Sequence, residues 1–175
     1  MDKEIKCIND RLWNESSNYL DYAHRCYEYV AKSFRYVHGS WRTLEQILND
    51  GGGECGDLST LVVNLLRYKG IPSRHNICLT LGGGYHVWTD FYLEGYGWIP
   101  FDVTYRCTDH SNDYFGVYDG QCVIMARDFC YDFGDEVQLT PDILQTYRYR
   151  YWYRDDTPNI SVQHYKYASS ITNGK

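Results

Sequence analysis

A cysteine, a histidine and an aspartate that could act together in catalysis follow one another within residues 51–102. Each stands in a short glycine-rich or aromatic motif: Cys55 in GECGD at 53–57, His86 in YHVW at 85–88, and Asp102 in WIPFD at 98–102. An imidazole beside a cysteine stabilises the nucleophilic thiolate, and a carboxylate holds the ring in the useful tautomer. This order therefore predicts acyl transfer by a thiolate with an oriented base.

The cysteine is predicted to lie at the start of a buried helix. Residues 57–68 carry one apolar stripe of helical period, formed by Leu58, Leu61, Val62, Leu65 and Leu66. The glycines at 51–53 allow a sharp turn into this helix. The free N–H groups at a helix N-terminus favour a thiolate and can donate to an oxyanion. We therefore expect the backbone at Cys55, with Gly56 as a further candidate, to contribute to an oxyanion site.

The histidine and the aspartate are predicted to lie on neighbouring antiparallel strands. After Pro72 the apolar period changes to two, which predicts strands at 75–81, 85–93 and 98–103. A turn centred near residue 94 would leave His86 and Asp102 each eight residues away. Antiparallel pairing would then place their side chains side by side.

The remaining segments are expected to complete a single α+β domain that spans residues 1–175. One or two amphipathic helices are predicted within 10–35, and a short helix capped by Ser40 is predicted to end at 49–53. Residues 107–120 have the composition of a loop, and 121–126 are predicted to form a strand. The alternating aromatic run at 147–154 predicts a further strand with one aromatic face.

Composition restricts the possible partners and the compartment. The 175 residues carry a net charge of −6 with a pI of about 5.4, which argues against a nucleic-acid or anionic-membrane partner. The charged N-terminus does not resemble a secretion signal, and no apolar run is long enough to span a membrane. Seven cysteines without a C-x-x-C pair fit a reduced cytoplasmic protein. The spacing of Cys107, Cys122 and Cys130 is unlike that of zinc ligands, so neither a metal nor a cofactor is expected.

Four blocks of the sequence resemble the core of the transglutaminase-like superfamily, whose members include protein-crosslinking enzymes, bacterial cysteine proteases and peptide N-glycanases. The blocks lie within residues 36–105 and occur in the family's order: GECGD at 53–57, LRYKGIPSR at 66–74, HVWTD at 86–90 and GWIPFD at 97–102. The resemblance implies a papain-like fold, in which a helix carrying Cys55 packs on an antiparallel sheet carrying His86 and Asp102. It also implies that these residues are the nucleophile, the base and the residue that orients the base. Val103 and Asp90 depart from the residues more usual at their positions.

The predicted reaction is attack of the Cys55 thiolate on an acyl carbon, protonation of the leaving amine by His86, and a thioester intermediate. Water as the acceptor gives hydrolysis of peptide or amide bonds in a peptide, a protein or a small acyl compound, which is the leading prediction. An amine as the acceptor gives a transglutaminase or an amide-forming acyltransferase, including one of small-molecule biosynthesis. A catalytically inactive binding module remains the third reading.

Further residues are assigned by their positions along the chain. Trp41 and Tyr36 are candidates for the second oxyanion donor. Trp88 and Trp98 are expected to pack on the sheet and form walls of the cleft. Asp57 is expected to cap the first helical turn, and Arg74 to form a structural ion pair.

Overall fold

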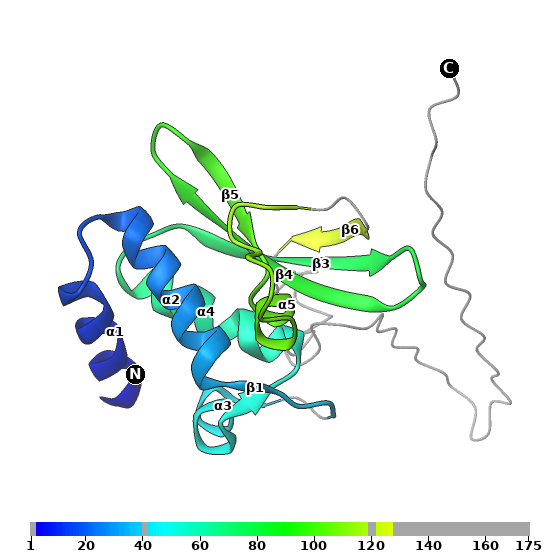
Figure 1. Ribbon diagram of the computed structural model, residues 1–175, viewed down its shortest axis with the longest axis horizontal. Helices are drawn as coiled ribbons and strands as arrows, with labels where there is room; N and C mark the ends of the chain where they lie inside the picture. The colour runs from blue at the N-terminus through cyan, green and yellow to red at the C-terminus, as the bar shows by residue number, and fades with distance from the viewer. Residues whose placement is uncertain (1–2, 40–41, 119–121, 128–175) are drawn as a thin grey trace, which may run out of the picture.

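The computed structural model describes residues 3–39, 42–118 and 122–127 (Figure 1). Five helices are described within these ranges: α1 (Lys3–Asn14), α2 (Tyr19–Ser33), α3 (Leu44–Asp50), α4 (Cys55–Tyr68) and α5 (Val103–Thr108). Six strands accompany them: β1 (Arg35–Tyr36), β2 (Gly52–Gly53), β3 (Ser73–Thr80), β4 (Tyr85–Leu93), β5 (Gly97–Phe101) and β6 (Cys122–Arg127). The predicted α+β class is confirmed.

The larger sheet has the strand order β5-β4-β3-β6, and its described pairs are antiparallel. Helix α4 packs against β4 and β3, and Ser59 donates to the Val87 carbonyl at 3.3 Å. The helix is amphipathic because Leu58, Leu61, Leu65 and other apolar residues recur at helical spacing, and all three named leucines are fully buried. The sheet and α4 therefore form two layers that share one core.

The predicted register of β4 and β5 was wrong by two residues. Leu93 pairs with Gly97 and Thr89 pairs with Phe101, so the turn is centred at residue 95. The turn includes Gly95 (φ +83°), and Gly97 follows it with φ +85°, a backbone region that favours glycine. The β4–β5 hairpin projects from the body of the molecule (Figure 1).

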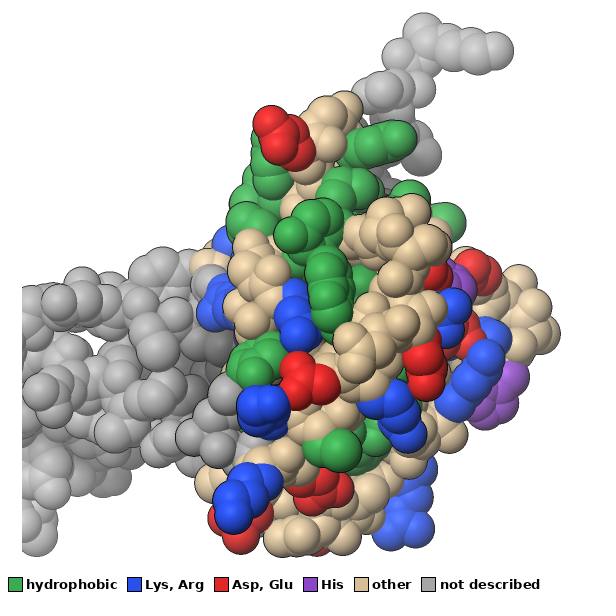
Figure 2. Space-filling view, turned by 90° about the vertical axis from the view of Figure 1, so that its left-hand side faces the viewer, with side chains coloured by type: hydrophobic (Ala, Val, Ile, Leu, Met, Phe, Trp, Pro, Cys, Tyr) green, Lys and Arg blue, Asp and Glu red, His purple; other side chains and the backbone are tan. Residues whose placement is uncertain are grey.

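The projecting hairpin carries exposed aromatic residues. Figure 2 shows hydrophobic side chains gathered at this end of the molecule. Tyr92, Tyr96 and Trp98 are all exposed, and the rings of Tyr92 and Trp98 make an edge contact at 5.6 Å between centroids. The Arg74 guanidinium lies 3.7 Å from the centre of the Trp98 ring and pairs with Asp90 at 2.9 Å. The predicted ion pair of Arg74 is confirmed.

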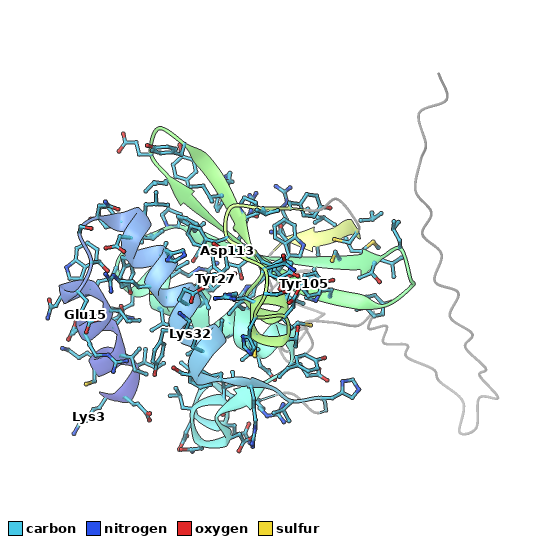
Figure 3. All side chains as sticks on the ribbon, viewed as in Figure 1. Lys3, Glu15, Tyr27, Lys32, Tyr105 and Asp113 are labelled. Carbon is cyan, nitrogen blue, oxygen red and sulfur yellow. The ribbon has the colours of Figure 1, made fainter. Side chains whose placement is uncertain are left out.

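The N-terminal helices form a helical layer that packs against α4 and, through α2, against α5. The predicted helical region divides into α1 and α2, because Asn18 caps α2 by accepting from Asp21 N at 2.9 Å. Tyr27 of α2 is fully buried, and its hydroxyl donates to Asp113 Oδ1 at 3.1 Å in the segment after α5 (Figure 3). Helix α2 thus supports the segment 109–118.

The short third helix begins later than predicted. Thr43, and not Ser40, is its N-cap: Thr43 Oγ1 accepts from Gln46 N at 3.2 Å, and Gln46 Oε1 accepts from Thr43 N at 2.8 Å. This capping box satisfies two backbone donors, whereas Ser40 lies outside the described residues. The predicted end is confirmed, since Gly51 adopts φ +62° there.

Two further outcomes concern the second half of the chain. The predicted strand near 121–126 is confirmed as β6, but helix α5 was not predicted, and Val103 begins this helix instead of ending β5. The predicted strand at 147–154 lies outside the described residues. Within the described part of the chain, no helix is both long and apolar enough to cross a membrane.

Candidate active site

Cys55 is the first residue of α4 and is buried, with 5% of its surface exposed. The chain reaches it through β2, whose glycines pair in parallel with Arg35 and Tyr36 of β1. A Cβ at Gly53 would overlap the Cβ of Asp57 and lie 2.8 Å from its Oδ2. A side chain is therefore sterically excluded at Gly53, and the glycine-rich approach that the sequence analysis noted has a packing reason.

Asp57 fixes the first turn of α4, as predicted. Its Oδ2 accepts from Glu54 N at 3.0 Å, and its carboxylate forms a buried ion pair with Arg42 at 3.2 Å. A negative charge in the first turn also suits the helix dipole. These contacts hold the backbone that carries Cys55 in place.

His86 and Asp102 are in direct contact. His86 donates from Nε2 to Asp102 Oδ2, and both residues are buried, each with 8% of its surface exposed. Asp102 is also the N-cap of α5, because its Oδ1 accepts from Tyr105 N at 2.9 Å. The carboxylate therefore meets His86 from a helix cap beyond the end of β5, not from a paired position in the ladder.

The imidazole of His86 contacts Cys55 as well. Burial of the ring alone would lower its pKa, but hydrogen bonds to Asp102 and Cys55, together with the charges of these partners, raise the pKa of His86 to about 10. The structure thus brings the three predicted residues together, with the imidazole in contact with both partners. Their catalytic roles stay a prediction.

Tyr105 is a site residue that the sequence analysis missed. Its ring stacks on the His86 ring with 4.7 Å between centroids and 9° between planes. Its backbone N–H holds Asp102, so this one residue contacts both members of the His86–Asp102 pair. Its position three residues after Asp102 would have marked it only if the capped helix α5 had been predicted.

The other predicted site residues have mixed outcomes. Tyr36 lies opposite Gly53 in the small sheet, and the charge of Cys55, after burial, is among the causes that raise the pKa of Tyr36. Gly56 is buried as the second residue of α4. Trp41 lies outside the described residues. Tyr36 therefore stays a candidate for the second oxyanion donor.

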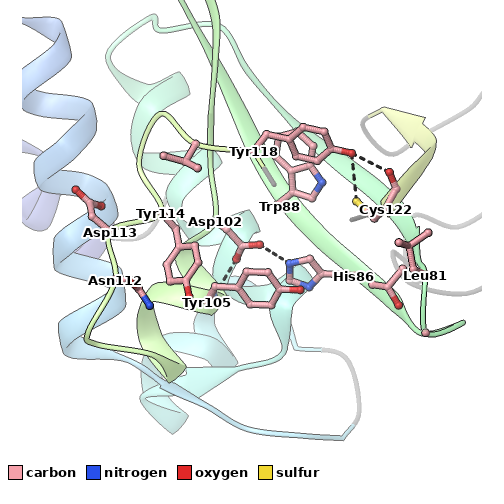
Figure 4. Close-up of a pocket in the computed structure, with 13 residues that line it drawn as sticks. Leu81, His86, Trp88, Asp102, Tyr105, Asn112, Asp113, Tyr114, Tyr118 and Cys122 are labelled. Atoms are coloured by element: carbon pink, nitrogen blue, oxygen red, sulfur yellow. Dashed lines mark hydrogen bonds and ion pairs between the residues drawn. The ribbon is translucent and has the colours of Figure 1, made fainter. Parts of the chain in front are cut away.

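A pocket of about 540 Å³ opens beside His86 and Asp102 (Figure 4). Aromatic rings from β4, α5 and the segment after α5 line it: Trp88, Tyr105, Tyr114 and Tyr118. Trp88 is buried and stacks on Tyr118, with 4.9 Å between centroids and 20° between planes. Trp88 therefore forms a wall, as predicted, whereas Trp98 is not among the lining residues.

Among the described residues, one group of possible metal ligands shares Asp113 with the lining of this pocket. Ligand atoms of His24, Glu28 and Asp113 all lie within 4.8 Å of one another. Glu28, however, already pairs with Arg106, at 2.9 Å, and with Lys32. Two cationic side chains thus compete with any metal ion for this carboxylate, and we assign no metal to the group.

Comparison with known protein families decides which family this site belongs to. The sequence profile of the Transglutaminase-like superfamily matches residues 7–103, which is more than half of the chain. The chain belongs to the transglutaminase-like superfamily. The matched range contains Cys55, His86 and Asp102, and it extends the resemblance noted at residues 36–105 to include α2 and most of α1.

A curated relative of this transglutaminase-like chain is an uncharacterized protein of Haemophilus influenzae. The two are 31% identical over 86 residues, which cover 34% of this chain and 23% of the relative. The transglutaminase-like chain therefore spans only a minor part of that relative's length.

Solved structures share the fold at low sequence identity. A candidate cysteine protease of Cytophaga hutchinsonii gives a TM-score of 0.53 at 19% identity, covering 70% of this chain and 42% of that one. The periplasmic domain of TgpA from Pseudomonas aeruginosa gives 0.52 at 19% identity, covering 59% and 43%. LapG of Legionella pneumophila gives 0.53 at 16% identity, covering 71% and 70%. These similarities establish the transglutaminase-like fold of the chain.

Proposed function

We propose that this chain is a cysteine-dependent enzyme that hydrolyses peptide or amide bonds through a thioester on Cys55. The observation that carries the proposal is the contact of one buried imidazole with both Cys55 and Asp102. An imidazole so placed can hold a thiolate as an ion pair and later supply its proton. The shared fold with a candidate cysteine protease of Cytophaga hutchinsonii supports hydrolysis.

Each step of the proposed reaction uses one contact of the site. The Cys55 sulfur attacks the acyl carbon, and the oxyanion accepts from N–H groups at the start of α4, with Tyr36 or Trp41 as the second donor. His86 gives its proton to the leaving nitrogen, and the C–N bond breaks to leave the thioester. His86 then takes a proton from water, which attacks the thioester and frees Cys55. Asp102 stabilises the charged imidazole throughout.

Transfer to an amine is the second candidate activity. An amine acceptor must lose its proton to the same imidazole that activates water, and the pocket beside His86 offers room for it. The product would then be a new amide, as in a transglutaminase or an amide-forming enzyme of small-molecule biosynthesis.

Alkylation of Cys55 by iodoacetamide, followed by peptide mass spectrometry, tests the thiolate. At pH 7 an ordinary thiol is mostly protonated, since its pKa is about 8.5. We expect Cys55, although buried, to react about tenfold faster than the exposed Cys7, and His86→Ala to remove this advantage. Equal or slower reaction of Cys55 in the wild type would favour an inactive binding module instead.

We also propose that the protein acts in the cytoplasm on a peptide, a protein or a small amide, without nucleic-acid or membrane partners. The six described cysteines form no disulfide, which suits a reducing compartment. Fractionation of cells that carry the tagged protein tests this location. Recovery of the protein with periplasmic markers, the compartment of the TgpA domain, would contradict it.

A further inference from the structure

The pocket beside His86 has a position and a lining that indicate what it binds. We propose that it holds the group attached to the amine nitrogen of the substrate and selects large apolar groups, aromatic ones above all. The inference rests on the proposed function, because it assigns one side of the scissile bond to this pocket. It adds a substrate class that the fold and the triad leave open.

The position of the pocket assigns it to the amine side. His86 and Asp102 line the pocket, whereas Cys55 is not among its described lining residues. The acyl carbon must reach the Cys55 sulfur, and the leaving nitrogen must lie within hydrogen-bond reach of the His86 ring. The group beyond that nitrogen therefore continues past His86, away from Cys55 and toward the pocket. By reversal of the same step, an amine acceptor enters through the same place.

The lining favours apolar groups over charged ones. Four aromatic rings line the pocket together with Leu81 and Val117, and no Lys or Arg is among the described lining residues. Asp102 is committed to His86 and to Tyr105 N. Asp113 already accepts from Tyr27 and from Phe115 N, each at 3.1 Å. Both carboxylates thus already accept hydrogen bonds within the protein. An aromatic group would bury much of its surface against the rings.

Several of the lining rings are held in place before any ligand binds. Tyr118 stacks on Trp88, and its hydroxyl donates to the Cys122 carbonyl at 2.8 Å (Figure 4). Tyr105 stacks on His86, opposite the wall that Trp88 and Tyr118 form. A site whose side chains are already fixed loses little conformational entropy on binding. The volume of about 540 Å³ leaves room for a side chain as large as that of phenylalanine.

Aminolysis of the acyl-enzyme tests this assignment. Cys55 is first acylated with a small acetyl thioester, and glycinamide, leucinamide, phenylalaninamide or lysinamide is then supplied as the acceptor. The C–S bond of the acyl-enzyme breaks, a C–N bond forms, and the amine's proton passes through His86 to the Cys55 sulfur. We expect the rate for phenylalaninamide to exceed that for glycinamide by about tenfold or more. Equal rates, or the highest rate for lysinamide, would overturn the proposal.

Two variants connect the preference to the pocket. Tyr118→Ala removes the ring that stacks on Trp88. The ratio of the phenylalaninamide rate to the glycinamide rate should then fall at least about threefold, as expected for the loss of one apolar contact. Tyr118→Phe keeps the ring and should keep the preference. Val117→Asp places a charge in the lining at an exposed position and should shift the preference toward lysinamide. Preferences unchanged in both Tyr118→Ala and Val117→Asp would show that another surface holds the amine group.

A failure of the pocket assignment can be told apart from a failure of the proposed function. Acylation by acetyl thioester depends on Cys55 and His86, not on the pocket, so normal acylation without amine preference rejects only the pocket. If no acylation occurs, the pocket assignment can still be tested by calorimetry, which measures how tightly phenylalaninamide and glycinamide bind to the Cys55→Ala protein. Tighter binding of phenylalaninamide that Tyr118→Ala weakens would support the assignment, and equal binding of the two amides would reject it.

Discussion

The electrostatics of the site depend on single side chains around His86. Its pKa of about 10 in the folded protein lies above the ordinary value of 6.5. A group whose pKa is raised by folding stabilises the protein fully below its unfolded pKa, and this stabilisation is lost as the pH rises through the folded pKa. The contribution of His86 should therefore be complete below about pH 6.5 and decline up to about pH 10.

Asp102→Asn tests this pH dependence and keeps the local fold. Asparagine is also a good N-cap, so the contact with Tyr105 N survives, but the charge that stabilises the imidazolium is lost. We expect the difference in unfolding free energy between wild type and variant to be largest near pH 6 and to shrink toward pH 10. Urea titrations at several pH values measure it. A difference that is constant with pH would contradict the charged pair.

Tyr105 is predicted to be a positioning residue through its ring. A ring stacked on an imidazole favours the charged form of that imidazole, so Tyr105→Leu should lower the pKa of His86 by about 0.5 to 1. Tyr105→Phe retains the stack and should leave the pKa near the wild-type value. The titration of the His86 ring by NMR measures both. The same pKa in Tyr105→Leu and the wild type would limit Tyr105 to a packing role.

At the scale of elements, the sequence predicted the strands better than their register. The alternation within β3, β4 and β5 identified all three strands, but glycines at 95 and 97 allow more than one turn, and the register differed by two residues. His86 and Asp102 still meet, because Asp102 reaches the ring as the cap of α5. That helix has only six residues, too few for a periodic signal, and the irregular segment after it supplies much of the pocket. The grouping of Cys55, His86 and Asp102 was thus predictable, whereas Tyr105 and the pocket were not.

The turn from β2 into α4 is predicted to tolerate no side chain at Gly53. Gly53→Ala places a Cβ on that of Asp57 and should destabilise the protein by about 1–3 kcal/mol, with slower alkylation of Cys55 because the helix start must shift. Gly82→Ala is the matched control, since the nearest atom to its new Cβ is 3.9 Å away. Urea denaturation compares the two variants. Equal stabilities would mean that the α4 start adapts without strain.

At the scale of the whole molecule, the helical layer supports part of the candidate active site. Tyr27 of α2 donates to Asp113 and accepts from Tyr114 N at 2.9 Å, so a buried helix residue holds two residues of the pocket lining. Phe115 packs beside it, with 5.4 Å between the ring centroids. Cys55 and His86 are therefore held by α4 and the sheet, whereas α2 holds the segment that lines one side of the pocket.

This division predicts that a change in α2 affects the choice of amine but not the nucleophile. Tyr27→Phe removes both hydrogen bonds and should cost about 1 kcal/mol of stability while weakening the preference for phenylalaninamide. Tyr22→Phe is the control, because Tyr22 lies in the same helix and is equally buried, but its hydroxyl contacts Asn9 Oδ1 and the Leu65 carbonyl, away from the pocket lining. Iodoacetamide should alkylate Cys55 at the wild-type rate in both variants. If Tyr22→Phe altered the amine preference as much as Tyr27→Phe, general loosening of the core would explain the effect, and the specific support of the pocket by α2 would be rejected.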